Sequence, residues 1–301
     1  MAPSEWPTPH WPQGVAREVS GYEKPLFSVL DETAKEYPNE VYTIFNDATR
    51  TYAQVKDTAD RVANFLVSRG IQKGDRVAIF LPNLPHYPAI FFGILKAGAV
   101  CVTCNPLYTA NELNYQLNDA GAKVVFCMDH PQLYPTTVAA VKDSGVESVI
   151  ICSVKSYLPK IKALLGGLLG KIPKAQHHES GHLFFDDIVA SAEPRPPAVE
   201  INPAEDLALI IYTGGTTGVP KGAALTHANI TYDLKASYEW IRLVHEPGAK
   251  PEKVRKGGHH AYLGMLPWYH SFSMTCALLS ACAAGAKLIC IPNPREKNPP
   301  F

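Results

Sequence analysis

Strand-like and helix-like segments alternate between residues 76 and 153, and this alternation constrains the fold more than any other feature of the sequence. Each strand-like run is a short block of aliphatic residues, and the helical segments between them are about 10–15 residues long. Strands separated in this way are joined by right-handed crossovers, which produce a parallel sheet with helices on both faces. The pattern predicts strands at 76–81, 99–103, 123–128 and 148–153 and helices at 87–97, 109–121 and 131–143. We therefore expect an α/β fold with mostly parallel sheets flanked by helices.

A proline-rich stretch, residues 193–203, follows this region and has the composition of a linker. Before the alternating region, apolar periodicity predicts a helix at 25–37, a strand at 41–45 and a further helix that Thr51 caps. The expected division is an N-terminal arm (1–24), a first α/β subdomain (25–192), the linker (193–203) and a second, incomplete α/β subdomain (204–301).

Composition excludes some classes of function and location. The 28 Lys and Arg residues balance 28 Asp and Glu residues, so long-range electrostatics give no support for nucleic-acid binding. The seven cysteines are an odd number, and those in apolar runs are typical of reduced core thiols, which favours the cytoplasm. The N-terminus does not resemble a signal peptide, and no apolar run reaches the roughly 20 residues that span a bilayer. We expect a cytoplasmic protein.

Residues 156–175 interrupt the alternation with an apolar segment. Two interpretations remain open. In the first, the segment rests on a membrane or frames an entry to the site, so that the protein lies peripherally at the inner face of the membrane. In the second, it is a surface helix hairpin between two lobes, with solvated lysines. The surrounding lysines are Lys155, Lys160, Lys162, Lys171 and Lys174.

The run from Tyr212 to Gly222, Tyr-Thr-Gly-Gly-Thr-Thr-Gly-Val-Pro-Lys-Gly, is rich in glycine and hydroxyl groups. It follows a strand-like run, 207–211, and precedes a segment that opens as a helix with Thr226 as its N-cap. Glycines let the backbone approach a ligand closely, threonines add hydroxyl donors, and the lysine adds positive charge. We expect a strand, a polyphosphate-binding loop and a helix in direct succession.

Two common nucleotide loops do not fit this run. A Walker loop reads Gly-x-x-x-x-Gly-Lys-Ser/Thr, but here Pro220 precedes the lysine and Gly222 replaces the hydroxyl that binds magnesium. The Gly-x-Gly-x-x-Gly fingerprint of dinucleotide folds is also absent here.

The eleven positions from Tyr212 to Gly222 resemble instead the signature loop of the adenylate-forming enzymes: acyl-CoA synthetases, luciferases and peptide-synthetase adenylation domains. The Gly214–Gly215 pair looks like the version found in long-chain fatty acid–CoA ligases. This resemblance implies the N-terminal domain of an adenylate-forming enzyme, truncated before its C-terminal domain. Other segments resemble the first half of a bacterial-type long-chain ligase, in the same order: 74–83, 92–98, 105–108, 112–113, 117–121, 266–270 and 293–295.

In that family a carboxylate attacks the α-phosphate of ATP, giving an acyl-adenylate and pyrophosphate, and coenzyme A then displaces AMP. The resemblance thus implies a fatty acid, ATP and coenzyme A as substrates, with magnesium. It places His270 beside the acyl chain and the carboxylate, with Trp268, Tyr269 and Phe272 as walls or as packing. No metal ligand is identifiable from the sequence. The residues that would bind the β- and γ-phosphates are Thr213, Gly214, Gly215, Thr216, Thr217, Gly218 and Lys221.

The family's later motifs have no counterpart up to Phe301. They include the aspartate that binds the ribose and the lysine of the C-terminal domain. We therefore expect the first part of an adenylation domain from a long-chain fatty acid–CoA ligase, inactive by itself. Two alternatives stay open: an aryl- or medium-chain acid–CoA ligase, and a non-catalytic fragment that binds ATP.

Overall fold

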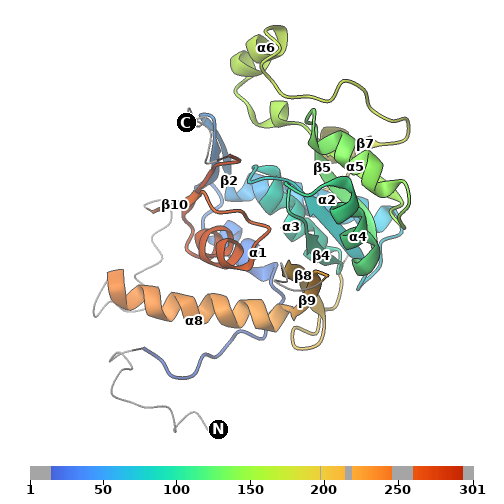
Figure 1. The fold of residues 1–301 in the computed structure, drawn as a ribbon. Coiled ribbons are helices and arrows are strands. Elements are labelled where there is room, and N and C mark those ends of the chain that lie inside the picture. The colour runs from blue at the N-terminus through green and yellow to red at the C-terminus, as the bar shows by residue number, and fades with distance from the viewer. Residues whose placement is uncertain (1–14, 197, 214–218, 246–259, 294–301) are drawn as a thin grey trace.

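Two mostly parallel sheets with helices on their faces form the part of the chain that the structure describes (Figure 1). The structure is a computed structural model and describes residues 15–196, 198–213, 219–245 and 260–293. The strands are β1 (Val41–Phe45), β2 (Ala48–Thr51), β3 (Arg76–Phe80), β4 (Val100–Thr103), β5 (Ala122–Met128), β6 (Ser148–Cys152), β7 (Leu183–Phe184), β8 (Leu207–Thr213), β9 (Lys221–Thr226), β10 (Ala261–Gly264) and β11 (Lys287–Cys290). The helices are α1 (Ser28–Glu36), α2 (Tyr52–Ser68), α3 (His86–Lys96), α4 (Ala110–Ala120), α5 (Leu133–Val141), α6 (Lys160–Leu168), α7 (Phe185–Ser191), α8 (His227–His245), α10 (Ser271–Ser273) and α11 (Ser280–Ala283), with a 3₁₀ turn η3 (Val154–Tyr157) and a π-helical stretch η4 (Met274–Leu279).

The larger sheet has the strand order β7-β6-β5-β3-β4-β8-β9. Its neighbouring strands pair in parallel except at one edge, where β9 runs antiparallel to β8. The predicted alternation between residues 76 and 153 is confirmed, with β3, α3, β4, α4, β5, α5 and β6 in succession. The predicted α/β fold with mostly parallel sheets is therefore correct.

The smaller sheet has the order β10-β11-β1-β2 and joins distant parts of the chain. Ile44 of β1 lies opposite Ile289 of β11, and Val102 of β4 in the larger sheet lies opposite Ile210 of β8. Neither sheet therefore lies within one of the two expected subdomains, because each takes strands from both sides of the linker. The division itself was drawn from composition along the chain, and it stays a prediction.

Alternate residues of the central strand β3 face two different cores. Val77 and Ile79 belong to the core that includes α2 and α3, whereas Ala78 and Phe80 belong to the core under α4 and α5. Every residue of α3 is buried. Strands covered on both faces read as continuous apolar runs, which is why the sequence reveals them clearly.

The chain does not pass directly from the glycine loop into a helix, and this expectation is wrong. Residues Lys221–Thr226 form β9, and α8 begins only at His227. The strand segment Lys-Gly-Ala-Ala-Leu-Thr has low intrinsic β-propensity, so pairing with β8 decides its conformation. Thr226 is confirmed as the N-cap, since its Oγ1 accepts the backbone N–H of Asn229 at 3.2 Å.

The segment 156–175 forms a projection at one end of the molecule, with α6 at its tip (Figure 1). No residue of α6 is buried. Among the described residues, no helix combines the length and the hydropathy that a membrane crossing requires.

Candidate functional site

The predicted site residues within the described ranges lie where parallel strands of the larger sheet end. β4 ends at Thr103 and β8, its neighbour, ends at Thr213. The segment that carries His270 reaches the same edge, because the Thr103 hydroxyl donates to the carbonyl of Tyr269 at 2.9 Å. In open α/β sheets, ligands bind outside the carboxyl ends of the strands. Thr213 and His270 thus lie at the edge where the fold favours a site.

Thr213 and Lys221 lie opposite each other at the mouth of the β8–β9 hairpin. The Thr213 hydroxyl donates to the carbonyl of Lys221 at 3.4 Å, and both residues are exposed. The intervening predicted site residues lie outside the described part of the chain, and their phosphate contacts stay predictions; they are Gly214, Gly215, Thr216, Thr217 and Gly218.

Two tyrosine hydroxyls hold the arms of the hairpin against α4. The Tyr212 hydroxyl donates to the Asp119 carboxylate at 2.5 Å, and the Tyr115 hydroxyl donates to the carbonyl of Pro220 at 3.1 Å. Burial, and then the hydrogen bond to Asp119, raises the pKa of the Tyr212 phenol above its usual value of 10.0. The phenol therefore stays protonated and remains a donor, and both arms of the hairpin are held against α4.

Close packing explains the glycine at position 222. A Cβ atom at Gly222 would lie 2.7 Å from Cγ2 of Ile210 and 3.2 Å from ring atoms of Tyr212. The missing side chain lets β9 lie under the Tyr212 ring, whose hydroxyl anchors the hairpin. Gly222, one of the two residues that separate this run from a Walker loop, thus has a structural role.

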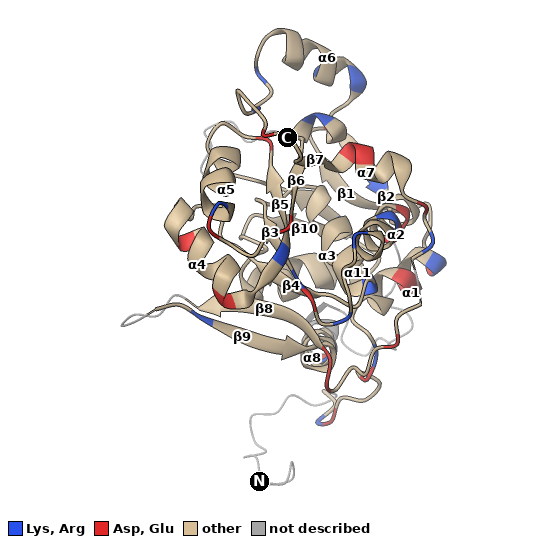
Figure 2. Cartoon of the chain, turned by 90° about the vertical axis from the view of Figure 1, so that its right-hand side faces the viewer, with Lys and Arg blue, Asp and Glu red and all other residues tan. Residues whose placement is uncertain are grey.

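The N-terminus of α8 lies at the opposite end of β9 from Lys221 (Figure 2). β9 has 6 residues, and a strand rises about 3.4 Å per residue, so Thr226, the N-cap of α8, lies about 17 Å from Lys221. The favourable effect of a helix N-terminus on an anion fades within its first turn. A phosphate group at this loop would therefore depend on backbone N–H groups, hydroxyls and Lys221.

His270 precedes the short helix α10 as its N-cap residue. Its Nδ1 accepts the backbone N–H of Phe272 at 3.4 Å, and the residue is exposed. Asn83, after β3, holds the preceding segment: its Oδ1 accepts the N–H of Trp268 at 2.9 Å, and its Nδ2 donates to the carbonyl of Leu266 at 2.8 Å. His270 is thus an exposed side chain on a backbone that the larger sheet positions.

The aromatic neighbours of His270 divide between packing and exposure. Trp268 is fully buried and meets the Tyr87 ring edge-on, with 5.6 Å between the ring centroids. Phe272 is exposed and Tyr269 is half-buried, with the pKa of its phenol raised by burial. Trp268 is therefore a packing residue, and only Tyr269 and Phe272 are available to contact a ligand.

A cavity of about 210 Å³ lies between the β8–β9 hairpin, α8 and η4, next to the residue that follows His270. Its walls are mainly apolar, and Asp233 is the charged residue among them. The lining residues are Leu209, Ile211, Leu225, Asn229, Ile230, Asp233, Ser271, Met274 and Thr275.

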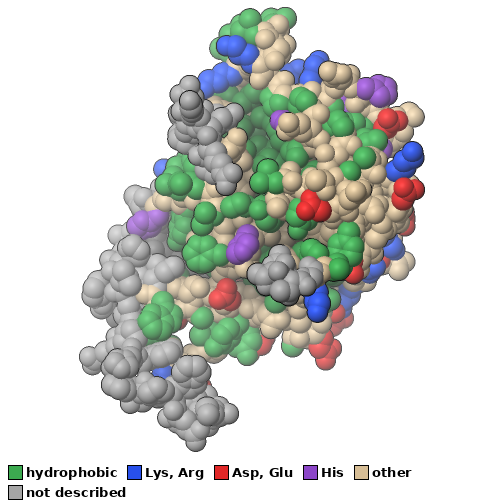
Figure 3. Space-filling view, in the orientation of Figure 1, with side chains coloured by type: hydrophobic (Ala, Val, Ile, Leu, Met, Phe, Trp, Pro, Cys, Tyr) green, Lys and Arg blue, Asp and Glu red, His purple; other side chains and the backbone are tan. Residues whose placement is uncertain are grey.

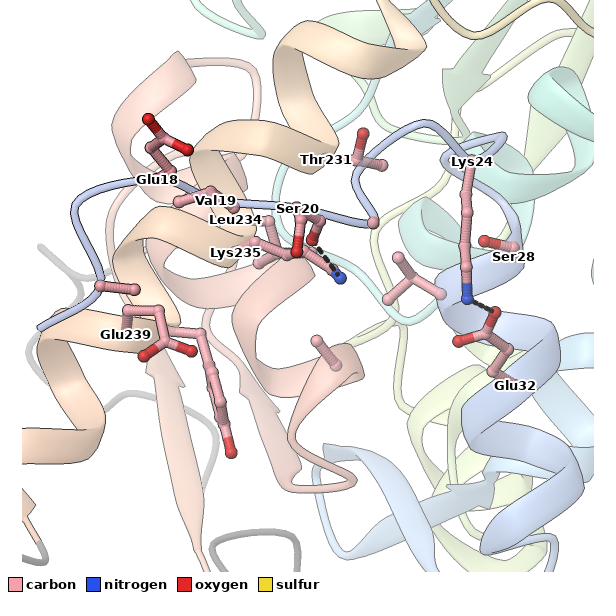
Figure 4. A pocket seen from close by; sticks show the side chains of 15 residues that line it. Glu18, Val19, Ser20, Lys24, Ser28, Glu32, Thr231, Leu234, Lys235 and Glu239 are labelled. Atoms are coloured by element: carbon pink, nitrogen blue, oxygen red, sulfur yellow. Dashed lines mark hydrogen bonds and ion pairs between the residues drawn. The ribbon is translucent and has the colours of Figure 1, made fainter. Parts of the chain in front are cut away.

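A larger cavity, of about 520 Å³, lies between residues 16–24, α1 and α8 (Figure 4). None of the predicted site residues lines it. Its lysines are already engaged: Lys24 pairs with Glu32 at 2.6 Å, and Lys235 donates to the carbonyl of Ser20 at 3.0 Å. We therefore place the candidate site at the carboxyl edge of the larger sheet, where Thr213, Lys221 and His270 lie.

The described residues contain no group of three or more His, Cys, Asp or Glu side chains able to hold a metal ion. The His178 Nε2 lies 3.0 Å from Asp129 Oδ1, and the His182 Nδ1 lies 2.8 Å from the Tyr134 hydroxyl. These contacts tie the segment after α6 to the body of the protein. The magnesium that the resemblance implies finds no side-chain ligand set in the described ranges, and no step below relies on that ion.

Sequence reasoning missed the residues that position this site, namely Asn83, Thr103, Tyr115 and Asp119. Asn83 and Asp119 belong to segments that resemble the ligase family, but nothing in the pattern assigned them contacts. A usable signal was present at Asn83 and Thr103, which are polar residues at or just after the ends of buried strands.

The comparisons with known proteins agree with this fold. The sequence profile of the AMP-binding enzymes matches residues 30–301. A long-chain-fatty-acid–CoA ligase of Bacillus subtilis is 34% identical over 292 residues, covering 94% of this chain and 49% of the relative. A ligase of the same name from Salmonella typhimurium is 31% identical over 275 residues, covering 90% of this chain and 47% of the relative. The chain therefore spans about half the length of the curated relatives it matches.

Solved structures give the same result for the fold. The crystal structure of a long-chain-fatty-acid-CoA ligase from Archaeoglobus fulgidus matches with a TM-score of 0.70 at 22% identity, covering 94% of this chain and 50% of that one. An anthranilate CoA ligase in complex with anthranoyl-AMP matches with a TM-score of 0.70 at 20% identity, covering 91% and 46% of the two chains. At such identities the likeness establishes the fold alone.

Proposed function

The chain belongs to the AMP-binding enzyme family, and from that premise we propose that it is the ATP-binding part of a long-chain fatty acid–CoA ligase. In this reaction a carboxylate oxygen of the acid bonds to the α-phosphorus of ATP, and the bond from that phosphorus to the bridging oxygen breaks. Pyrophosphate leaves, and an acyl-adenylate remains. The coenzyme A thiol then attacks the acyl carbon, loses its proton and releases AMP.

One observation carries the proposal: the Thr213–Lys221 pair stands at the mouth of a hairpin at the carboxyl edge of the parallel sheet. An anionic acid must approach a polyanionic nucleotide, so the barrier falls when fixed donors and cations surround the phosphates. Lys221 is exposed at this edge, and the Tyr212 and Tyr115 hydrogen bonds hold the two arms of the hairpin. We assign to Lys221 and the loop the binding of the β- and γ-phosphates and the stabilisation of departing pyrophosphate.

We assign the acid to the side of the loop where His270 and the apolar cavity lie. The imidazole is exposed, while the cavity beside Ser271 offers an apolar surface for the first part of an acyl chain. His270 would donate a hydrogen bond to a carboxylate oxygen and orient it towards the α-phosphate. This assignment is supported by the Thr103–Tyr269 bond, which fixes the backbone beside His270.

The size of the cavity favours a second candidate, an aryl- or medium-chain acid–CoA ligase. Its volume of about 210 Å³ is below the roughly 300–1,000 Å³ typical of sites for larger ligands. A single ring or a short chain would fill it, whereas a long chain would have to extend beyond it. A pyrophosphate-release assay of the complete gene product with palmitate, octanoate and benzoate separates the candidates. Palmitate should give the highest kcat/KM, and a preference for benzoate would replace the first candidate by the second.

ATP binding by the 301-residue chain tests the phosphate loop directly. We expect Lys221→Ala to weaken ATP binding about 10- to 100-fold by calorimetry, because a hydrogen bond to a charged group contributes about 1.5–3 kcal/mol. The matched control is Lys142→Ala, which removes an exposed lysine elsewhere and should leave the affinity unchanged. Equal ATP affinities of the two variants would contradict the assignment.

The chain spans only about half the length of its relatives, so the activity of these 301 residues alone needs its own test. We propose that the 301 residues bind ATP and form no acyl-CoA by themselves. An assay with ATP, palmitate and coenzyme A, read by mass spectrometry of the thioester, tests this, and turnover at the level of an ordinary ligase would refute it. ATP binding without turnover by the complete gene product as well would favour a non-catalytic ATP-binding protein.

A further inference from the structure

The helix α6 presents an apolar face to solvent. Ile161, Leu164, Leu165 and Leu168 follow one another at helical spacing, and Leu169 directly after the helix continues the row. These five side chains are between 51% and 76% exposed, and we call them the α6 face. Exposed apolar patches of this kind mark interaction sites. Figure 3 shows hydrophobic and lysine side chains together on this projection.

The charged residues of the segment that carries the α6 face are all lysines. Between residues 154 and 178 the sequence has five lysines and neither Asp nor Glu. Lys162 pairs with Asp47 of the β1–β2 turn, which ties the helix to the smaller sheet. The other lysines are exposed, and they are Lys155, Lys160, Lys171 and Lys174. A positive ring around an apolar face is complementary to a surface with anionic head groups above hydrocarbon.

The residue types of this projection favour lipid over protein as the partner. Protein interfaces are enriched in aromatic residues and Arg and depleted in Lys. The segment 158–174 contains only Lys, Leu, Ile, Ala, Gly and Pro. It thus offers neither the aromatic anchors nor the varied polar groups that recognise a specific protein. We propose that the α6 face docks on an anionic lipid bilayer, with its leucines in the interface and its lysines at the phosphates.

The body of the protein fixes the base of the projection. The Arg50 guanidinium lies over the Tyr157 ring at 4.9 Å and donates to the carbonyl of Ser156 at 3.2 Å. On the returning side, a Cβ at Gly166 would lie 3.0 Å from Cγ1 of Ile172, so the chain crosses the helix there. The opposite, apolar side of α6 stays open. The docking surface is therefore held in place before it meets a membrane.

Docking does not depend on the proposed ligase function, because it needs neither ATP nor an acid. The test is flotation of the 301-residue chain with vesicles of phosphatidylcholine alone or mixed equally with phosphatidylglycerol. We expect binding to the anionic vesicles that weakens as ionic strength rises above about 0.1 M, since added salt screens the lysines. Binding that is equal on both vesicle types would overturn the proposal.

Two variants separate the apolar and the charged contributions. Changing Leu164, Leu165, Leu168 and Leu169 together to Ser should reduce the partition coefficient at least a hundred-fold. Lys171→Gln with Lys174→Gln should reduce it about thirty-fold, at about 1 kcal/mol per lysine near the surface. The matched controls are Leu107→Ser and the pair Lys35→Gln with Lys142→Gln, which change exposed residues elsewhere. Losses of the same size in the controls would refute the specific role of α6.

A second measurement keeps the proposal testable if a variant associates with itself. Leu168→Cys labelled with an environment-sensitive dye should shift its emission to the blue on anionic vesicles; of the native cysteines, only Cys276 is not fully buried. Size-exclusion chromatography without lipid tests a second copy of the chain as the occupant. A wild-type dimer that the four serine changes convert to a monomer, with no vesicle binding, would assign the face to self-association instead.

Discussion

The helices α3 and α6 are both short and apolar, yet they have opposite environments. Every residue of α3 is buried, including Lys96, whereas no residue of α6 is buried. α3 lies against α2 so closely that a Cβ at Gly93 would be 2.7 Å from Cβ of Val62. α6 touches the body through a few contacts at its base. The comparison shows that apolar character fixes neither burial nor role, because both depend on what the fold places alongside the helix.

The largest expected effect concerns the buried charge of α3. The Lys96 ammonium lies 2.5 Å from the Asp60 carboxylate, with both side chains 5% exposed, and it also pairs with Asp31. Asp60→Ala should lower the free energy of unfolding by about 3–5 kcal/mol, because it leaves the buried Lys96 cation without its one fully buried carboxylate partner. The α6 counterpart, Lys162→Ala, breaks an exposed ion pair and should lower the free energy of unfolding by only about 0–1 kcal/mol. Urea unfolding measures both, and equal losses would break the comparison.

The second effect is a pH dependence at the start of α3. Burial lowers the pKa of His86 to about 3 from 6.5, so the unfolded chain binds a proton that the folded protein excludes. The resulting stability is complete above pH 6.5 and is lost as the pH falls towards 3. As the pH falls from 6.5 to about 4, the free energy of unfolding should therefore drop by about 3 kcal/mol less in His86→Leu than in the wild type. Parallel stability curves would contradict this; α6 contains no histidine.

A pair of glycine changes tests packing at the two helices. Gly93→Ala should lower stability by about 1–3 kcal/mol, since its Cβ would also lie 2.8 Å from the carbonyl oxygen of Ala59. Gly167→Ala in α6 meets nothing within 4 Å and should raise helix stability by up to about 1 kcal/mol. Thermal unfolding should therefore move in opposite directions for the two variants. A stabilised Gly93→Ala would show that α2 and α3 pack less closely than described.

The smallest effect is expected on the α6 face itself. Leu168→Ser should change the free energy of unfolding by no more than about 0.5 kcal/mol, because its side chain is exposed. The same substitution should instead weaken the binding of the α6 face to lipid. A loss above about 2 kcal/mol would indicate a folding role that the described contacts do not contain.

Local signals in the sequence predicted much of the secondary structure correctly. The helix predicted at 109–121 is confirmed as α4, and a capping box at Thr109 and Glu112 starts it, with the Thr109 N–H donating to the Glu112 carboxylate at 2.8 Å. Buried parallel strands were visible because their apolar runs are continuous. The strand β9 was missed, since its Gly-Ala-Ala core has little strand preference and forms only by pairing with β8.

The candidate site was predictable in its residue types and not in its geometry. The run at 212–222 predicts a polyphosphate loop, and the structure places Lys221 and Thr213 opposite each other in the β8–β9 hairpin. Tyr115 and Asp119, which hold the arms of the hairpin, belong to α4, about a hundred residues earlier in the chain. No local pattern reports a contact at such a separation.

The sequence alone determined the α/β class, the alternating strands and helices, and the glycine loop, because period, capping and glycine content act over a few residues. The tertiary structure decided which strands share a sheet, that β8 and β9 pair as a hairpin, and that α3 is buried while α6 is exposed. These outcomes depend on pairing and packing between segments far apart in the chain. Each segment's own residues permit more than one of them, and only its neighbours in the folded protein select one.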